Sequence, residues 1–458
     1  NQICKKHKAS LCYFGWRQLI DFAKSNENKV AKDIIILAKA ALHLECGNMN
    51  KLESDTQERK RPWRIGIFGT FDVQNYGDLL FPILAEMELS QRLGSVELIP
   101  FSYHAKSLED WPYKVASLAD LPDMAIELDA ILIGGGFIIR FDSFVAPGYV
   151  PTEAWIHHPT GYWLTPALIG IQLGIPVIWN APGMHCNEMP QWSHPLLSLV
   201  LQCSSYIAVR DEPSKKALEQ FVDHDRVKLV PDTAFSLGQH MNGHPAQEKA
   251  RILREQLGLK KPYIVIQATQ NLEKFTDHIK RFRSELPDLE FLLLRLGPVL
   301  CDHESFIDRE LPNTYSLAEW PSPMVLAALV AESEGVAGHS YHLAITALCA
   351  GIPVFTPSDL SVGKFTALSR FRTVYPLSTM DCDDPRWLSS RIGRMSPLDL
   401  MENARDEVKQ HWDHVVDSIK SSCSSSKIAM NKFLMSLPFL LERGKSEKGE
   451  AGLQGKVD

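Results

Sequence analysis

The sequence predicts an α/β protein made of two Rossmann-like, doubly wound domains. Two observations support this fold class. Short apolar runs alternate with helical segments, and this alternation stops once, at a polar stretch covering 238–248, before it starts again. Such alternation is typical of a parallel sheet that carries helices on both faces. At 458 residues, 45% of them hydrophobic, the chain is long enough for two or three domains.

The predicted domain boundaries follow changes in composition along the chain. Residues 1–60 combine helical apolar spacing with a closing charged run, which indicates a helical extension and a linker. The N-terminal Rossmann-like domain is expected at 61–240 and the C-terminal one at 241–385. C-terminal helices at 386–445 and a disordered tail at 446–458 complete the prediction.

The expected strands are apolar runs of four to eight residues. The first, RIGIFGTF at 64–71, precedes the helical segment 75–94, which ends in glycine. The other runs of the first domain are VELIPFS, AILIGGGFI, IPVIWNAPG, SYIAVRD and VKLVPD. Those of the second domain are PYIVIQAT, EFLLLRLG, SEGVAGHS and GIPVFTP, with helical segments expected at 272–286 and 321–333. The similar corners at 173–182 and 350–359 fit two related halves, although any doubly wound sheet can contain this corner.

Charge and cysteine content limit the functional classes. Lys and Arg total 48 against 55 Asp and Glu, a net charge of −7, so a nucleic-acid partner is not expected. Nine cysteines without a CxxC pair indicate reduced thiols in a cytoplasmic protein, with no metal site and no disulfide framework. The apolar stretch 164–179 is interrupted by two prolines, which favours a buried helix, turn and strand over a membrane span. The chain opens with Asn, so removal of a targeting segment stays open.

Two corners of the first domain carry candidate ligand-binding residues. Asn75, Gly77 and Asp78 begin the helix after the first strand, where free N–H groups suit anions or hydroxyl-rich ligands. Asp78 is a candidate to orient or deprotonate a sugar hydroxyl, and simple helix capping is the alternative. Gly135 and Gly136 follow a buried strand, where backbone can approach a substrate, or where a turn needs positive φ.

Charged side chains follow three further strands. Arg210 is a candidate fork for a carboxylate or phosphate, unless it only pairs with Asp211 in capping the next helix. His339 and His342 lie at a strand-to-helix corner and are suited to proton transfer near neutral pH or to holding an anion. Lys364 follows the next strand and would bring a second cation to the same place, unless it is an ordinary exposed lysine.

In this order and spacing, the motifs resemble the polysaccharide pyruvyl transferase family over roughly residues 64 to 375. The family's NxGD opening is similar to Asn75–Asp78, its triple glycine to Gly134–Gly136, its RDxxS corner to Arg210–Ser214 and its DPAF strand end to Asp232–Phe235. The resemblance implies a GT-B-like fold, with two domains facing a crevice, and transfer of pyruvate from phosphoenolpyruvate to a sugar as a ketal.

Two positions depart from the family pattern. Thr233 replaces the proline of the DPAF motif, and Ser340 replaces the arginine of an Arg-Leu-His motif, while His342 and Lys364 match. Loss of that arginine removes a partner for the donor's carboxylate or phosphate. His339, Arg295 or Lys364 would then have to supply the charge at the donor site that includes Ser340.

The resemblance, joined to the chemistry of these side chains, gives each a role. His342 is expected to be the general acid, Arg210 and Lys364 to hold the donor's oxyanions, and Asp78 to act on the acceptor hydroxyl. Asn75, Gly77, Gly135 and Gly136 are expected on the acceptor side. Phosphoenolpyruvate is the expected donor substrate, and no cofactor is implied, because the reaction includes no hydride transfer.

The acceptor is expected to be a sugar of a glycan or of its lipid-linked precursor, which leaves peripheral contact with a membrane open. Two alternatives share the fold. One is a glycosyltransferase that uses a nucleotide-sugar donor, and the other is a catalytically inactive sugar-binding paralogue. The acceptor sugar, the linkage and the oligomeric state are not determined by the sequence.

Overall fold

The computed structural model describes most of the chain between residues 61 and 436. The described ranges are 61–109, 111–141, 159–184, 189–260, 262–298, 302–303, 307, 311, 313–393, 399–421, 430–431 and 433–436. The helical extension predicted at 1–60 and the tail predicted at 446–458 lie outside these residues. The domain boundaries at 240 and 385 stay predictions.

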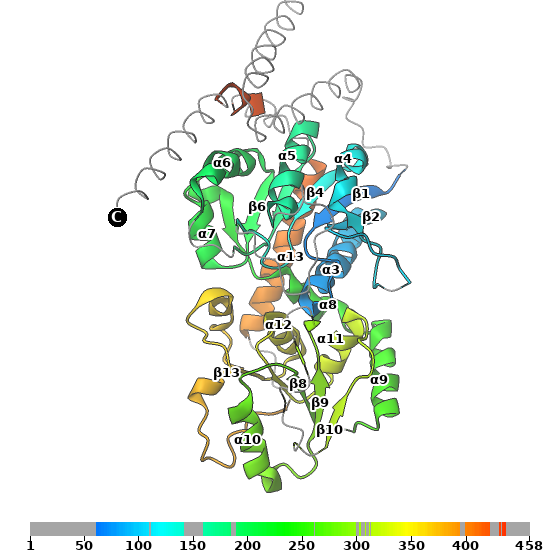
Figure 1. The fold of residues 1–458 in the computed structure, drawn as a ribbon, viewed down its shortest axis with the longest axis vertical. Coiled ribbons are helices and arrows are strands. Elements are labelled where there is room, and N and C mark those ends of the chain that lie inside the picture. The colour runs from blue at the N-terminus through cyan, green and yellow to red at the C-terminus, as the bar shows by residue number, and fades with distance from the viewer. Residues whose placement is uncertain are drawn as a thin grey trace, which may run out of the picture. The chain divides into compact units, whose positions relative to one another are not determined.

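The first sheet has seven parallel strands in the order β3-β2-β1-β4-β5-β6-β7. The strands are β1 (Trp63–Phe68), β2 (Val96–Ser102), β3 (Ala116–Ser117), β4 (Ala130–Ile133), β5 (Val177–Asn180), β6 (Tyr206–Val209) and β7 (Val227–Leu229). Its helices are α3 (Tyr76–Leu93), α4 (Leu121–Met124), α5 (Leu164–Leu173), α6 (His194–Cys203) and α7 (Glu212–Leu218). The central strands β1 and β4 are almost wholly buried, as expected when helices cover both faces (Figure 1).

The second sheet has six parallel strands in the order β10-β9-β8-β11-β12-β13. The strands are β8 (Tyr263–Gln267), β9 (Glu290–Leu294), β10 (Thr314–Ser316), β11 (Val336–Ala337), β12 (Val354–Thr356) and β13 (Val374–Pro376). Its helices are α9 (Pro245–Leu257), α10 (Glu273–Arg281), α11 (Pro323–Ala331) and α12 (Tyr341–Ala350), and the short α8 (Leu237–His240) lies before α9 in the chain. In each sheet the strand order reverses direction beside the first strand, which is where doubly wound sheets bind ligands.

Two such sheets confirm the predicted fold class. The apolar stretch 164–179 folds as α5, a turn at Gly174 and β5, as its prolines predicted. The strands that the sequence did not reveal are β3, β10 and β13, all at or beside a sheet edge and only two or three residues long. Edge strands bury less surface, so they need no continuous apolar run that a sequence pattern would detect.

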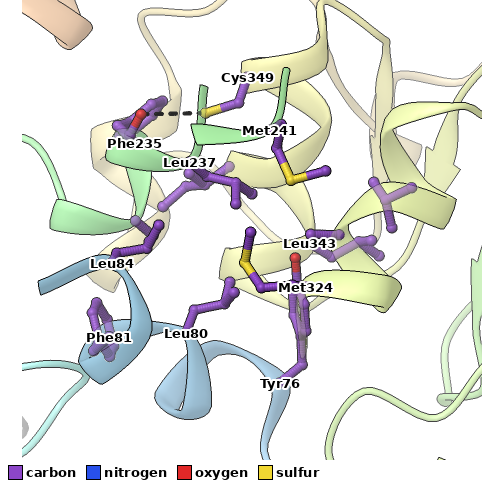
Figure 2. Close-up of a cluster of buried hydrophobic side chains, with 14 of the residues drawn as sticks. Tyr76, Leu80, Phe81, Leu84, Phe235, Leu237, Met241, Met324, Leu343 and Cys349 are labelled. Carbon is purple, nitrogen blue, oxygen red and sulfur yellow. Dashed lines mark hydrogen bonds between the residues drawn. The ribbon is translucent and has the colours of Figure 1, made fainter. Parts of the chain in front are cut away.

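Helices α3 and α12 pack together and join the two sheets through one apolar cluster. Figure 2 shows side chains of α3 meeting those of the segment 235–241 and of α11 and α12. The Tyr76 and Thr346 hydroxyls lie 2.7 Å apart in a buried hydrogen bond, and Cys349 Sγ donates to the Phe235 carbonyl at 3.6 Å. Helix α12 is apolar on nearly every face because protein surrounds it. The starts of α3 and α12 are thereby fixed close together.

The long helix α13 (Asp399–Lys420) returns to the first domain, where it contacts α3, β5 and β6 (Figure 1). Trp412 Nε1 donates to Ser236 Oγ at 2.9 Å, and His411 Nε2 lies 2.8 Å from Asn180 Oδ1. Burial lowers the pKa of His411 to about 3, so this imidazole is neutral at physiological pH. Arg405 Nη2 of α13 also donates to the Cys349 carbonyl of α12 at 2.9 Å, so this helix contacts both halves of the chain.

Cys203, Cys349 and Cys382 form no disulfide within the described part of the chain, and the other six cysteines lie outside the described residues. Within the described part of the chain, no helix combines the length and the apolar character needed to cross a membrane.

Candidate functional site

The site of interest lies where the strands of both sheets end. Five titratable residues form what we call the strand-end cluster: Asp78 at the start of α3, Arg210 after β6, Asp232 after β7, His342 in α12 and Lys364 after β12. The electrostatic influence of His342, Arg210 and Lys364 reaches Asp78, so the cluster draws on both domains. Four of the five were predicted from the sequence.

Asp78 is held by two side chains from the β1–α3 corner. Its Oδ2 accepts hydrogen bonds from Thr70 Oγ1 at 2.8 Å and from Asn75 Nδ2 at 2.9 Å. Asn75 occupies the N-cap position of α3 without a side-chain capping bond, so the simple capping alternative does not describe either residue. Desolvation raises the pKa of Asp78, and His342 and Thr70 partly oppose that rise. A carboxylate with a raised pKa is a stronger base than usual.

The triple glycine packs against protein side chains. Gly135 and Gly136 have φ values of 99° and 78°, as the turn alternative expects. A Cβ on Gly135 would lie 2.6 Å from the Phe81 ring, and one on Gly136 would lie 2.7 Å from Asp78 Oδ1. These glycines therefore let α3 and Asp78 approach the β4 strand end. Acceptor binding by Gly135 and Gly136 stays a prediction.

Arg210 is buried and paired, in contrast to the open fork that the sequence suggested. Its Nη1 donates to Asp232 Oδ2 at 2.7 Å, with side-chain exposures of 2% and 1%. The guanidinium also lies 5.2 Å from the Tyr341 ring centre. Asp211 also pairs with Arg210, whose Nε lies 4.0 Å from Asp211 Oδ2, while Asp211 Oδ1 accepts from Ser214 N at 2.8 Å to start α7. Donor binding by Arg210 stays a prediction.

Asp232 lies between Arg210 and His342. Its Oδ1 accepts from Ala234 N at 2.9 Å, which begins the turn of helix at 233–236, and its Oδ2 lies 3.7 Å from His342 Nε2. Burial alone would raise the pKa of this carboxyl, but His342 and Arg210 outweigh burial and hold it well below its usual range. Asp232 is therefore an anion that can stabilise a protonated His342.

His342 lies in the first turn of α12, directly against the start of α3. A Cβ added to Gly77 would come 1.7 Å from His342 Nδ1, so only glycine leaves room for the imidazole. The ring also meets Phe81 edge-on, with 5.2 Å between the ring centres. Its Nε2 has no hydrogen-bond partner among the described residues. Gly77 is therefore a packing residue for His342, and its predicted acceptor role is untested.

Lys364 belongs to the short helix Gly363–Leu368 and remains partly exposed. Its ammonium lies 5.5 Å from the Phe365 ring centre and 6.0 Å from that of Tyr341. Desolvation and the nearby Arg210 lower the pKa of Lys364 to about 8, although Asp78 and Asp232 oppose the change. A lysine in this setting suits an anionic ligand that would restore its full charge.

The three remaining donor-side residues occupy different places. Ser340 is the N-cap of α12, and its Oγ accepts from Leu343 N at 3.3 Å. His339 reaches the surface beside it, and desolvation and Lys364 lower its pKa while Asp302 opposes that shift. Arg295, at the end of β9, lines a small cavity with Trp320, whose indole donates to the Arg295 carbonyl at 2.7 Å. No residue of the strand-end cluster lines that cavity.

Comparison with known proteins assigns the chain to a family. The family model for polysaccharide pyruvyl transferase matches residues 75–356, more than half of the sequence. The chain belongs to the polysaccharide pyruvyl transferase family. The matched range opens with Asn75 of the NxGD motif, includes His342 and ends at the last residue of β12, eight residues before Lys364. No curated protein sequence matches the chain.

The two parallel sheets of this pyruvyl transferase family member, together with one solved structure of TM-score above 0.5, show a GT-B-like fold. UDP-GlcNAc 2-epimerase from Methanocaldococcus jannaschii is 11% identical with a TM-score of 0.52, covering 78% of this chain and 99% of that one. The same enzyme from Neisseria meningitidis, bound to UDP-GlcNAc, is 14% identical with a TM-score of 0.46, covering 77% and 99%. The wall teichoic acid polymerase TagF is 12% identical with a TM-score of 0.38, covering 90% and 96%. At such identities the likeness concerns the fold alone.

The sequence identifies Asp232 only as part of a family motif and does not reveal its place between Arg210 and His342. A positional signal was available, because Asp232 follows a short strand and all parallel strands of a sheet end at one edge. The sequence likewise does not reveal Gln267 at the end of β8 or its partner Asp302. Nothing in the local sequence marks Gln267, since the hydrogen-bond partners of its side chain lie 35 to 73 residues away.

Proposed function

We propose that this pyruvyl transferase family member transfers pyruvate from phosphoenolpyruvate to a sugar of a glycan, or of its lipid-linked precursor, and forms a ketal. The observation that carries the proposal is the strand-end cluster: an imidazole beside a buried carboxylate, two cations and a second carboxylate held at the junction of the two sheets. Phosphoenolpyruvate is a small trianion, which these cations suit.

The overall reaction needs one proton on carbon and a path for another. Two acceptor hydroxyls form C–O bonds to C2 of phosphoenolpyruvate, the C2–O bond to phosphate breaks, and the methylene carbon becomes a methyl group. Of the two hydroxyl protons, one is balanced by the proton added to carbon, and the other leaves with phosphate. The reaction is redox-neutral and needs no oxidant or reductant.

Each residue of the strand-end cluster has a proposed role that follows from its chemistry and position. His342, stabilised as an imidazolium by Asp232, is the general acid that protonates the methylene carbon. Lys364 binds a donor oxyanion, and buried Arg210 adds positive charge behind it. Asp78 accepts a proton from an acceptor hydroxyl, because its raised pKa makes it a better base than an ordinary carboxylate. A cytoplasmic location and a lipid-linked acceptor belong to the same proposal.

The test is phosphate release from phosphoenolpyruvate with hexose, N-acetylhexosamine and lipid-linked sugar acceptors, followed by mass spectrometry of the products. The proposal expects sugar-dependent phosphate release and a product that has gained a pyruvyl ketal. His342→Gln should abolish both, while His224→Gln, at a side chain with 71% exposure, should leave both unchanged. A new glycosidic bond with release of a nucleotide would refute the proposal in favour of a nucleotide-sugar transferase. Sugar binding without turnover of either donor would favour an inactive paralogue.

A further inference from the structure

Gln267, the last residue of β8, makes four hydrogen bonds in the interior of the second domain. Its Oε1 accepts from the backbone amides of His339 at 3.0 Å and Ser340 at 2.8 Å. Its Nε2 donates to both carboxylate oxygens of Asp302, at 3.1 and 3.0 Å. Gln267 is 3% exposed and Asp302 is 7% exposed, so loss of these bonds would leave buried polar groups without partners.

These partners require both halves of the amide. Two N–H donors face one end of Gln267 and a carboxylate faces the other, which fixes the orientation of the amide chemically. A glutamate would set two carboxylates against each other, and a methionine would bond to neither side. The backbone is shaped to this residue as well, because a Cβ on Gly338 would lie 2.7 Å from Gln267 Oε1.

Asp302 extends the connection to the other domain. Its Oδ2 accepts from the amides of Leu296 at 3.0 Å and Gly297 at 2.9 Å. The Leu296 carbonyl in turn accepts from the Tyr76 amide at 2.7 Å, at the first residue of α3. One buried chain of hydrogen bonds therefore runs from the residues that begin α12, which carries His342, to the start of α3, which carries Asp78.

We infer that Gln267 and Asp302 are positioning residues that set the place of His342 relative to Asp78 by fixing the starts of α12 and α3. The inference deepens the proposed function and rests on it for its catalytic consequence. Neither residue is assigned contact with substrate. Each acts through backbone: Gln267 through the amides at 339 and 340, and Asp302 through Leu296.

The experiment uses the full chain with three variants and one control. Gln267→Met removes all four bonds at similar side-chain volume, and Gln267→Glu adds carboxylate repulsion. The double variant Gln267→Glu with Asp302→Asn keeps the total charge and reverses the donor and acceptor of one hydrogen bond between the two positions. The amide of the asparagine can donate to the glutamate, while its carbonyl still accepts from Leu296 and Gly297. Ser333→Ala is the control, because Ser333 also makes two buried bonds but precedes β11 rather than following it.

Turnover supplies the first measurement. Both single variants should lower kcat about 10²-fold, the scale expected when a catalytic group is displaced by about 1 Å, with KM for phosphoenolpyruvate nearly unchanged. The exchange variant should recover most of the loss, and Ser333→Ala should match the parent. A control that loses as much kcat as Gln267→Met, or an exchange variant no better than Gln267→Glu, would overturn the inference.

A measurement without turnover separates this inference from the proposed function. NMR of the histidine rings identifies the His342 signal as the one missing in His342→Gln. The chemical shifts of the His342 ring should change in Gln267→Met and stay unchanged in Ser333→Ala. An unchanged His342 signal in folded Gln267→Met would refute the positioning role, whether or not phosphoenolpyruvate is the donor. A changed signal in a protein that never uses phosphoenolpyruvate would instead refute only the proposed function.

Discussion

Neutralising Asp232 is the most direct perturbation of the strand-end cluster. Asp232→Asn keeps the size of the side chain and an oxygen that can accept from Ala234 N, so the turn of helix at 233–236 should still form. It removes the negative charge that lies 2.7 Å from Arg210 and 3.7 Å from His342. We expect a loss of stability whose size depends on pH.

The stability change follows from distance and burial. At 2.7 Å and an effective dielectric constant of about 20, the Coulomb attraction between Asp232 and Arg210 is about 6 kcal/mol. Desolvation of both groups offsets part of this attraction, and removing one partner of a buried pair typically costs about 3–5 kcal/mol. We therefore expect Asp232→Asn to lower the free energy of unfolding by about 3–5 kcal/mol at pH 7.

The contribution of Asp232 to the free energy of unfolding decreases as the solution becomes more acidic. The folded-state pKa of Asp232 lies below its unfolded value of about 3.9, so its contribution is complete above about pH 5 and declines as the pH falls toward the folded-state pKa. The difference in the free energy of unfolding between the parent and Asp232→Asn should be about 1 kcal/mol smaller at pH 3 than at pH 7.

Urea unfolding, followed by circular dichroism at several pH values, measures the stability difference between the parent and Asp232→Asn. Asp225→Asn is the matched control, because that side chain is 94% exposed and should change stability by less than about 0.5 kcal/mol. A loss below about 1 kcal/mol for Asp232→Asn at pH 7, or a difference that does not narrow in acid, would refute this account of the cluster.

Three other changes test the site. Lys364→Gln should raise KM for phosphoenolpyruvate about 10–100-fold. In the parent, donor affinity should fall as the pH rises through about 8, the pKa of Lys364. Steady-state kinetics from pH 6.5 to 9.5 measure this, and a KM that does not change with pH would contradict it. Ser340→Arg should lower KM for phosphoenolpyruvate several-fold. Loss of the N-cap of α12 should lower the free energy of unfolding by about 1 kcal/mol, measured by thermal unfolding. An unchanged KM would mean that position 340 does not face the donor. Gly77→Ala should displace His342 and lower kcat about 10²-fold in a protein that still folds, so near-normal turnover would contradict the packing at this position.

The fold was largely predictable because its signals are local. Buried parallel strands need continuous apolar runs, and helices that end in glycine mark the corners between them. Gly174 and Gly351 illustrate this, since both take left-handed conformations at the C-caps of α5 and α12, where the repeated corner was predicted. The short strands β3 and β13 gave no such signal, because two or three residues at a sheet edge carry too little pattern.

The candidate site was predictable only as residue types at strand ends. Asp78, His342 and Lys364 follow predicted strands, and parallel strands of one sheet end at one edge, so their grouping within each domain could be expected. Sequence alone left Arg210 with two interpretations, an open fork or a partner of Asp211. The structure contains the pair with Asp211 at 4.0 Å and adds a shorter buried pair with Asp232, which the sequence could not show because 22 residues separate Arg210 from Asp232 and the β6–β7 pairing brings them together.

The sequence by itself determined the fold class, the strand ends that carry charged side chains and the motifs of the family, since each depends on neighbouring residues and their periodicity. Only the tertiary structure decided which charges neutralise one another, that Gly77 makes room for His342, and that Gln267 connects the starts of α12 and α3 through Asp302. The physical reason is that hydrogen bonds and Coulomb interactions act over a few ångströms in space, whatever the separation of their partners along the chain.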